Sequence, residues 1–302
     1  MKKLLVGTLI IGTSMFASMS KGELDSFKSL NVLSDPAVTL IDGKKIDGSD
    51  LTLLKGYYHS GDNYSPINLI TNKEIVITGQ AFNAKSKLPY LIDTDYSQFE
   101  KYAAFKIGTG SKRLMLFTDA ECPYCKQFDS KFDELKNEYT IYVYMLPLNE
   151  IHFASKDIAI ATFAQDKDKE QYFKKLMHSQ DLTKDLPELA KYSVELYKNI
   201  KNSINSLNPK VQGLGNKYVQ MVQAAYNVKF ENREDISKFC DKKIEEFYKN
   251  KAAVELNKKA LAMFEENAKL SGGYLGANGT PMVYDYSGAN VELQNLFKMN
   301  WG

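Results

Sequence analysis

The 302-residue chain has few cysteines, histidines and tryptophans: three cysteines, three histidines and one tryptophan. Three cysteines are too few to staple a small disulfide-rich scaffold. The 39 basic side chains nearly balance the 37 acidic ones, so a net charge of +2 predicts no field that gathers nucleic acid or anionic lipid. Beyond the N-terminal residues no segment is long and apolar enough to span a membrane. These absences argue against a disulfide scaffold, a nucleic-acid-binding protein and a multi-span membrane protein.

The first 20 residues have the layout of a secretory signal peptide. Lys2 and Lys3 precede an uncharged, largely apolar run from Leu4 to Phe16, and small residues follow it. This run is shorter than the roughly 20 residues that a spanning helix needs, although an uncleaved anchor is the alternative. The absence of a nearby cysteine disfavours a lipoprotein. We therefore expect residues 1–20 to direct the protein to the periplasm.

Short strand-like runs dominate residues 21–92. Residues 38–41 and 44–46 flank Asp42-Gly43, which predicts a hairpin with a tight turn. Further strand-like runs follow towards Gly79. A domain this small has little core of its own and would gain from pairing with a second copy.

A linker helix is predicted over residues 93–108, because Tyr96, Phe99 and Tyr102 recur at helical spacing. The remaining residues, 109–302, form the second predicted domain.

This second domain begins with a strand, a helix and a strand. The apolar run 114–117 predicts a buried strand, and residues 139–146 predict another after an intervening helix. That order is the first half of a thioredoxin-like fold. Residues 155–270 are almost entirely helical in pattern, strand character returns at 282–286, and 291–299 fits a closing helix. We predict an α+β fold: a thioredoxin-like domain with an enlarged helical insertion, preceded by a small strand-rich domain and a linker helix.

Cys122-Pro123-Tyr124-Cys125 is the strongest chemical motif. At a helix start, unpaired N–H groups stabilise a thiolate and lower the pKa of Cys122 below about 8.5. The thiolate is the species that attacks disulfides, and Cys125, one turn on, can then resolve the mixed disulfide. Pro123 suits the first helical turn. Tyr124 brings no positive charge and Glu121 opposes the thiolate, so we expect a moderately lowered pKa.

A purely structural short-range disulfide is one alternative for this motif, and a zinc site is another. A zinc site needs further ligands, and Cys240, His59, His152 and His178 form no second C-x-x-C and no close histidine pair. We therefore expect no metal and no cofactor. The pattern around Cys240 predicts a buried thiol, with an exposed third thiol as the alternative. His152 and His178 are expected to be structural or surface residues rather than catalytic ones. Asp119 is expected to cap a turn, with proton transfer as the alternative.

Thr280-Pro281 precedes the strand-like run 282–286. A proline that opens a central strand needs a special backbone role, and an ordinary loop proline is the alternative.

The segment Phe117–Phe128 (FTDAECPYCKQF) resembles the active-site segment of the DsbC/DsbG family of thiol–disulfide interchange proteins, and DsbG in particular. Thr280-Pro281 resembles the family's Thr–cis-Pro loop, and 54–57 and 75–79 resemble strands of its dimerisation domain. The resemblance implies a V-shaped homodimer joined through residues 21–92, and a loop at Thr280 and Pro281 that faces Cys122 and binds substrate. It also implies disulfide exchange in exported proteins that contain cysteines. The helical insertion is longer than the family's usual one.

Several functions remain open. An isomerase or reductase would be kept reduced by a membrane partner, and Cys122 would attack wrong disulfides. A dithiol oxidase would donate the Cys122–Cys125 disulfide and be recycled by a membrane oxidase. A dimeric chaperone with secondary thiols and a reductase of sulfenic acids are further alternatives. Thr280 and Tyr124 favour the isomerase or reductase.

Overall fold

The computed structural model describes residues 19–61 and 63–297. The predicted signal peptide, except for its last two residues, lies outside this range, as do positions 298–299 of the predicted closing helix. The chain divides into two compact units at Ile92/Asp93, with residues 59–65 grouped in the second. Among the described residues, no helix has both the length and the apolar character needed to cross a membrane.

The first unit is a four-stranded sheet with the strand order β1-β2-β3-β4. A capping box between Ser20 and Glu23 begins helix α1, which buries Leu24 and Phe27 in the small apolar core that also contains Leu54. The elements are α1 (Lys21–Phe27), η1 (Asn31–Leu33), β1 (Val38–Lys45), β2 (Thr52–Ser60), β3 (Asn63–Thr71) and β4 (Val76–Thr78).

The prediction of a hairpin turn at Asp42-Gly43 is wrong. Strand β1 runs through both residues and pairs with β2 along its whole length, with a register shift between Leu40 and Asp42. This bulge accommodates the extra residue. The chain reverses at the turn around Gly48, whose φ of 74° favours glycine.

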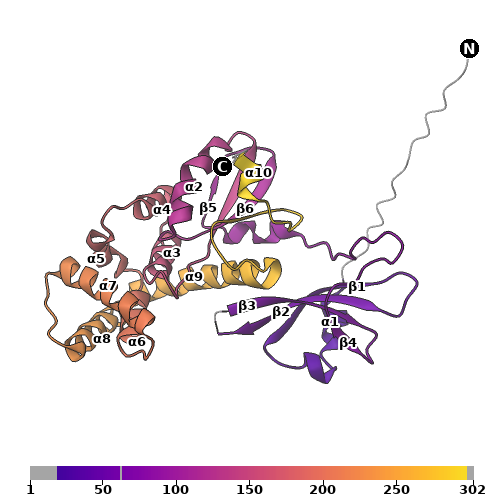
Figure 1. Ribbon diagram of the computed structural model, residues 1–302, viewed down its shortest axis with the longest axis horizontal. Coiled ribbons are helices and arrows are strands. Elements are labelled where there is room, and N and C mark those ends of the chain that lie inside the picture. Colours follow the sequence, from indigo (N-terminus) through magenta and orange to yellow (C-terminus); the bar gives the residue numbers. More distant parts are fainter. Residues whose placement is uncertain (1–18, 62, 298–302) are drawn as a thin grey trace, which may run out of the picture. The chain divides into compact units, whose positions relative to one another are not determined.

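The second unit contains a sheet with the order β5-β7-β6-β8. Strands β5 and β6 of this sheet are labelled in Figure 1. Strand β6 is parallel to β7 and antiparallel to β8. Alternate residues of β6 enter two cores: Leu116 packs with helices α2 and α10, while Phe117 packs with η2 and η4 on the other face. The elements of this layer are η2 (Tyr96–Tyr102), β5 (Phe105–Ile107), β6 (Lys112–Thr118), α2 (Pro123–Glu134), β7 (Tyr139–Met145), η4 (Lys269–Leu275), β8 (Met282–Asp285) and α10 (Leu293–Phe297).

The linker helix predicted over 93–108 needs correction. Only Tyr96–Tyr102 is helical, as a 3₁₀-helix, and Phe105–Ile107 is strand β5. The three-residue spacing of Tyr96, Phe99 and Tyr102 fits the three-residue turn of a 3₁₀-helix, which turns these rings towards one core. The segment is therefore part of the second unit.

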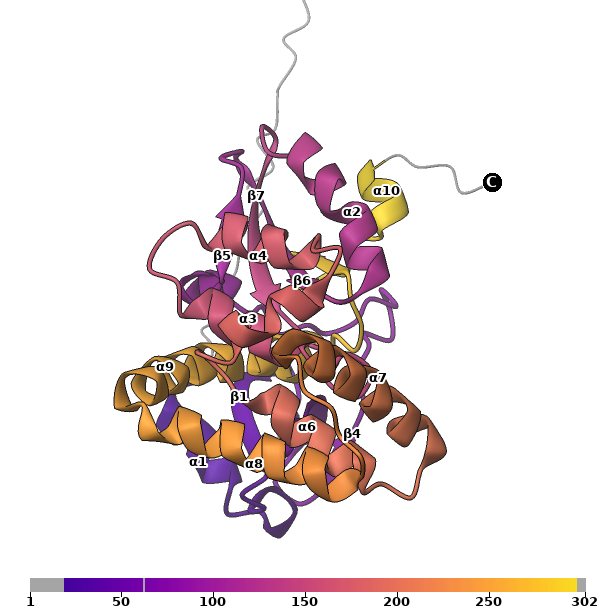
Figure 2. The ribbon, with the colours of Figure 1, turned by 90° about the vertical axis from the view of Figure 1, so that its left-hand side faces the viewer.

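A helical insertion separates β7 from β8, as predicted. Helices α6, α7 and α8 pack together in Figure 2, and their core includes Tyr197, Tyr218 and Cys240. Buried Asn267 ties the insertion to the sheet, because it accepts a hydrogen bond from Met145 N and donates to two carbonyl groups. The elements are α3 (Ser155–Phe163), α4 (Lys169–Met177), η3 (Leu182–Lys184), α5 (Leu186–Leu189), α6 (Glu195–Ile204), α7 (Pro209–Tyr226), α8 (Arg233–Lys249) and α9 (Lys251–Ala268).

Candidate active site

Cys122 is the N-cap residue of α2, and Pro123 occupies the first helical turn. The loop from β6 is held by a hydrogen bond from Cys122 N to the Asp119 carbonyl oxygen. Cys122 and Cys125 are both free thiols and are buried to a similar degree, with exposed fractions of only 3% and 2%. Tyr124 between them is 65% exposed.

Thr280 and Pro281 lie beside Cys122, joined by a cis peptide bond. The Cys122 thiol donates to the Thr280 carbonyl oxygen over 3.4 Å. This meeting follows from the sheet, because Met282, which begins β8, pairs with Phe117 near the end of β6. The Thr280 hydroxyl is buried and makes no hydrogen bond to a described residue, and its position beside Cys122 helps to lower the pKa of that thiol.

The two cysteines differ in their acidity. Hydrogen bonding from the Cys125 thiol is the largest cause that lowers the pKa of Cys122, to about 5, with help from Thr280 and from the N–H groups of Cys125 and Tyr124. Burial, followed by the nearby Cys122 sulfur, raises the pKa of Cys125. The arrangement therefore gives a reactive thiolate at Cys122 and keeps the proton on Cys125.

Asp119 braces the loop before Cys122. Its buried carboxylate accepts hydrogen bonds from Leu148 N, His152 Nδ1, Glu121 N and Ser155 Oγ. Burial raises the pKa of Asp119, but the bonds from His152, Leu148 and Ser155 outweigh it and lower the pKa overall. The same pairing raises the pKa of His152 against the effect of burial. Asp119 thus does more than cap a turn, and its pairing with His152 favours the charged form of that imidazole.

Glu121 connects the same loop to the helical insertion. Its carboxylate accepts a 2.7 Å hydrogen bond from the hydroxyl of Tyr218 on α7, and another from Ala154 N. Tyr218 also stacks on Phe153. These donors compensate the carboxylate beside Cys122. No sequence pattern links Tyr218 to Glu121, because the two residues are 97 positions apart.

The remaining candidates are Cys240, His59 and His178. Cys240 is 1% exposed and burial raises its pKa to about 12, which fits the expected buried thiol. His59 stacks on Tyr64, and His178 pairs with Asp129. Across the described residues, no group of three or more His, Cys, Asp or Glu side chains is arranged to hold a metal ion.

Comparison with solved structures gives matches at low sequence identity and low TM-score. ScsC from Proteus mirabilis in a compact conformation has 17% identity and a TM-score of 0.35, covering 69% of this chain and 80% of that chain. A thioredoxin-like oxidoreductase from Silicibacter pomeroyi DSS-3 has 14% identity and a TM-score of 0.32, covering 63% and 85%. The thiol-disulfide exchange protein α-DsbA2 from Wolbachia pipientis has 15% identity and a TM-score of 0.27, covering 63% and 82%.

A match between the sequence and a family model identifies the family of the chain. A comparison with curated proteins found no match. The family model described as thioredoxin-like domain matches residues 102–291, which is more than half of the chain. The matched range includes both the C-x-x-C and the cis-proline loop. The predicted thioredoxin-like α+β fold is confirmed. The chain belongs to the thioredoxin-like domain family.

Proposed function

We propose that this protein is a periplasmic thiol–disulfide oxidoreductase that acts on exported proteins. One observation carries the proposal: the Cys122 sulfur lies at the start of α2 with a pKa lowered to about 5, against the Thr280–Pro281 loop. The Cys122 thiolate attacks a substrate disulfide and forms a mixed disulfide, releasing one substrate thiolate. Cys125 then attacks Cys122, releases the second substrate sulfur as a thiolate and leaves a Cys122–Cys125 disulfide.

Activity on a mispaired substrate tests this directly. Wild-type protein should speed the recovery of activity by scrambled ribonuclease, and C122S should abolish the effect. C125S keeps the nucleophile and should retain part of the isomerase activity, because a substrate thiol can also resolve the mixed disulfide. Equal recovery with C122S and wild type would reject the proposal.

We further propose that the reaction runs as disulfide interchange of the DsbC/DsbG type. Support comes from the FTDAECPYCKQF segment and from Thr280 before the cis-proline. A membrane reductase would keep the pair reduced.

An oxidase is the second candidate, and a specific observation favours it. A pKa of about 5 for Cys122 stabilises the reduced form, which makes the disulfide more oxidising. Alkylation trapping in intact cells separates the two: interchange predicts a mainly reduced pair, whereas an oxidase predicts a mainly oxidised pair.

A homodimer through residues 21–92 is also proposed. Strand β4 is an edge of the first sheet. Ile77 lies on this strand and is 50% exposed, and Ile75, just before the strand, is 55% exposed. An open edge with exposed apolar side chains suits pairing with a second copy of the chain. Sedimentation analysis should give twice the monomer mass, and I77K should shift the protein towards monomer; a wild-type monomer would contradict the proposal.

A further inference from the structure

Two carboxylates precede the nucleophile within three residues, and a nearby carboxylate disfavours negative charge on Cys122. The Asp119 side chain is fully buried and its two oxygens accept four hydrogen bonds, two of them from backbone N–H groups. Glu121 is nearer to Cys122 in the chain and has fewer donors. Each donor to Glu121 therefore matters more for the compensation of its charge.

Ser155 cannot donate to both carboxylates. Its hydroxyl lies closer to Asp119 Oδ1 than to Glu121 Oε2, which is 3.2 Å away. A hydroxyl has one hydrogen to donate, and the shorter contact assigns it to Asp119. This leaves the backbone N–H of Ala154, 2.9 Å from Glu121 Oε2, as the donor to that oxygen.

Tyr218 on α7 supplies the hydrogen bond to the other oxygen of Glu121. The Tyr218 hydroxyl lies 2.7 Å from Glu121 Oε1 and 3.2 Å from the backbone nitrogen of Phe153. The N–H group of Phe153 can only donate, so the phenol oxygen accepts this bond and donates its own hydrogen to Glu121. Burial, followed by the charge of Glu121, raises the pKa of Tyr218, so the phenol keeps this hydrogen. Of the side chains that the structure describes, Tyr218 is therefore the one that donates to Glu121.

Tyr218 is held firmly within the helical insertion. It is 1% exposed, and its ring stacks on that of Phe153 with 5.1 Å between the centroids. Asn199 on α6 in turn donates a hydrogen bond to the carbonyl oxygen of Phe153. A donor fixed in this way also fixes the direction of the Glu121 carboxylate.

We propose that Tyr218 is a positioning residue: it holds the Glu121 carboxylate against the helical insertion and so limits the repulsion between this charge and the Cys122 thiolate. This inference rests on the proposed function, in which the thiolate is the attacking species. With these bonds in place, hydrogen bonding from Cys125, burial and Thr280 have the largest effects on the pKa of Cys122, and Glu121 is not among them. The insertion thus helps to set the stability of the thiolate, and with it the reduction potential of the pair.

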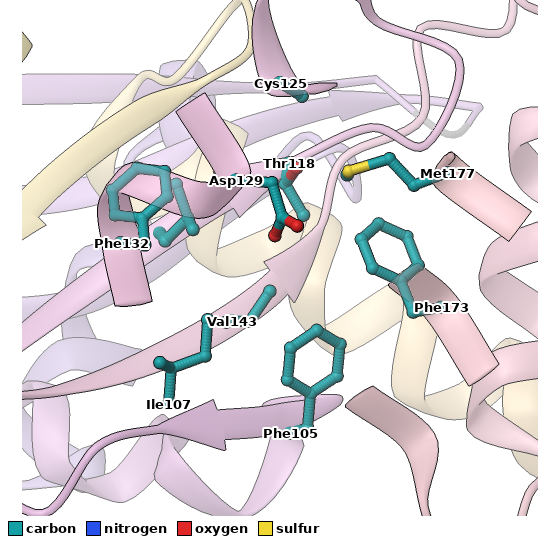
Figure 3. A pocket seen from close by; sticks show the side chains of 10 residues that line it. Phe105, Ile107, Thr118, Cys125, Asp129, Phe132, Val143, Phe173 and Met177 are labelled. Carbon is teal, nitrogen blue, oxygen red and sulfur yellow. The ribbon is translucent and has the colours of Figure 1, made fainter. Parts of the chain in front are cut away.

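The test is the pH midpoint of Cys122 alkylation by iodoacetamide in the reduced protein, since only the thiolate reacts. Cys125 does not interfere, because it lines a small, mostly apolar pocket with Phe173 and Met177 (Figure 3) and burial raises its pKa. Y218F keeps the aromatic ring but removes the donated hydrogen. The midpoint should then rise by about half a pH unit, because a nearby charge shifts a pKa by roughly one unit or more and the loss of one donor uncovers only part of the charge.

E121Q and Y197F provide the controls. In the E121Q background no charge remains at this position, so adding Y218F should leave the midpoint unchanged. Tyr197, on α6 of the same insertion, is also 1% exposed, but its hydroxyl hydrogen-bonds that of Tyr226 over 2.7 Å. Y197F removes the same atom from a buried ring and should leave the Cys122 midpoint at the wild-type value, even where it lowers the stability.

A rise of the midpoint in Y218F that disappears in the E121Q background supports the positioning role. An unchanged midpoint in Y218F overturns it, as does an equal rise in Y197F or an equal effect of Y218F with and without E121Q. E121Q alone should not raise the midpoint, and such a rise would overturn the role of Tyr218 even if Y218F does not fold. The proposed function fails on a different result, namely wild-type protein that does not speed the recovery of scrambled ribonuclease.

Discussion

Replacing Thr280 with valine should raise the pKa of Cys122. The Thr280 hydroxyl makes no hydrogen bond to a described residue, and it is positioned to donate one to the Cys122 thiolate, which helps to lower the pKa of Cys122. A hydrogen bond to a charged group contributes about 1.5 kcal/mol at the lower end of the usual range, and this corresponds to about one pKa unit. T280V should therefore move the Cys122 pKa from about 5 to about 6. Valine keeps the shape of threonine, so the change is mainly electrostatic.

The assay is the rate of Cys122 alkylation by iodoacetamide as a function of pH, since only the thiolate reacts. The reduction potential should also become more negative by about 30 mV, because the reduced form loses about 1.4 kcal/mol of stabilisation. T280S keeps the hydroxyl and should behave as wild type. An unchanged pH midpoint of Cys122 alkylation in T280V would refute this role of the Thr280 hydroxyl. An equal shift of the midpoint in T280S and T280V would refute it as well.

Three further results are expected. The Cys122 pKa is lowered from 9.0 to about 5, so the free energy of unfolding of the reduced protein should rise by about 1.4 kcal/mol for each pH unit between 5 and 9. This stabilisation should be lost as the pH falls through 5. Denaturant titrations should show no such pH dependence for C122S. Y218F removes a donor to Glu121 and should cost about 1–2 kcal/mol in thermal unfolding, and an unchanged melting temperature would contradict the role of this bond. Native Cys240, with its pKa raised to about 12, should resist alkylation until the protein unfolds, and labelling as fast as that of Cys122 would contradict its burial.

The local parts of the site could be predicted from the sequence. The position of Cys122 at the start of a helix follows from the apolar strand before it and from Pro123, which suits a first turn. The Thr280–Pro281 loop was predictable because a proline before a strand marks a special backbone position. Both signals involve residues that are adjacent in the chain.

The charged surroundings of Cys122 could not be predicted in this way. Asp119 and Glu121 are adjacent to the motif, but their donors His152 and Tyr218 come from a loop and from the helical insertion. A single sequence does not show which distant side chains will meet. The insertion therefore contributes to the site directly, since Tyr218 on α7 binds the residue that precedes the nucleophile.

The two errors in secondary structure have physical causes that lie outside the local sequence pattern. Asp42-Gly43 has the composition of a tight turn, but pairing of β1 with β2 continues past it through a bulge. The aromatic spacing from Tyr96 to Tyr102 fits both an α-helix and a 3₁₀-helix, and burial against the sheet decides between them. Tertiary contacts overrule the local pattern in both places.

Trapping of mixed disulfides tests the central claim most directly. C125S leaves the Cys122 nucleophile without its resolving partner, so covalent complexes with exported proteins should accumulate in cells and disappear on reduction. The double variant C122S/C125S should give none. Complexes that persist in the double variant, or that form through Cys125 in C122S but not through Cys122 in C125S, would contradict the assignment of Cys122 as the attacking thiol.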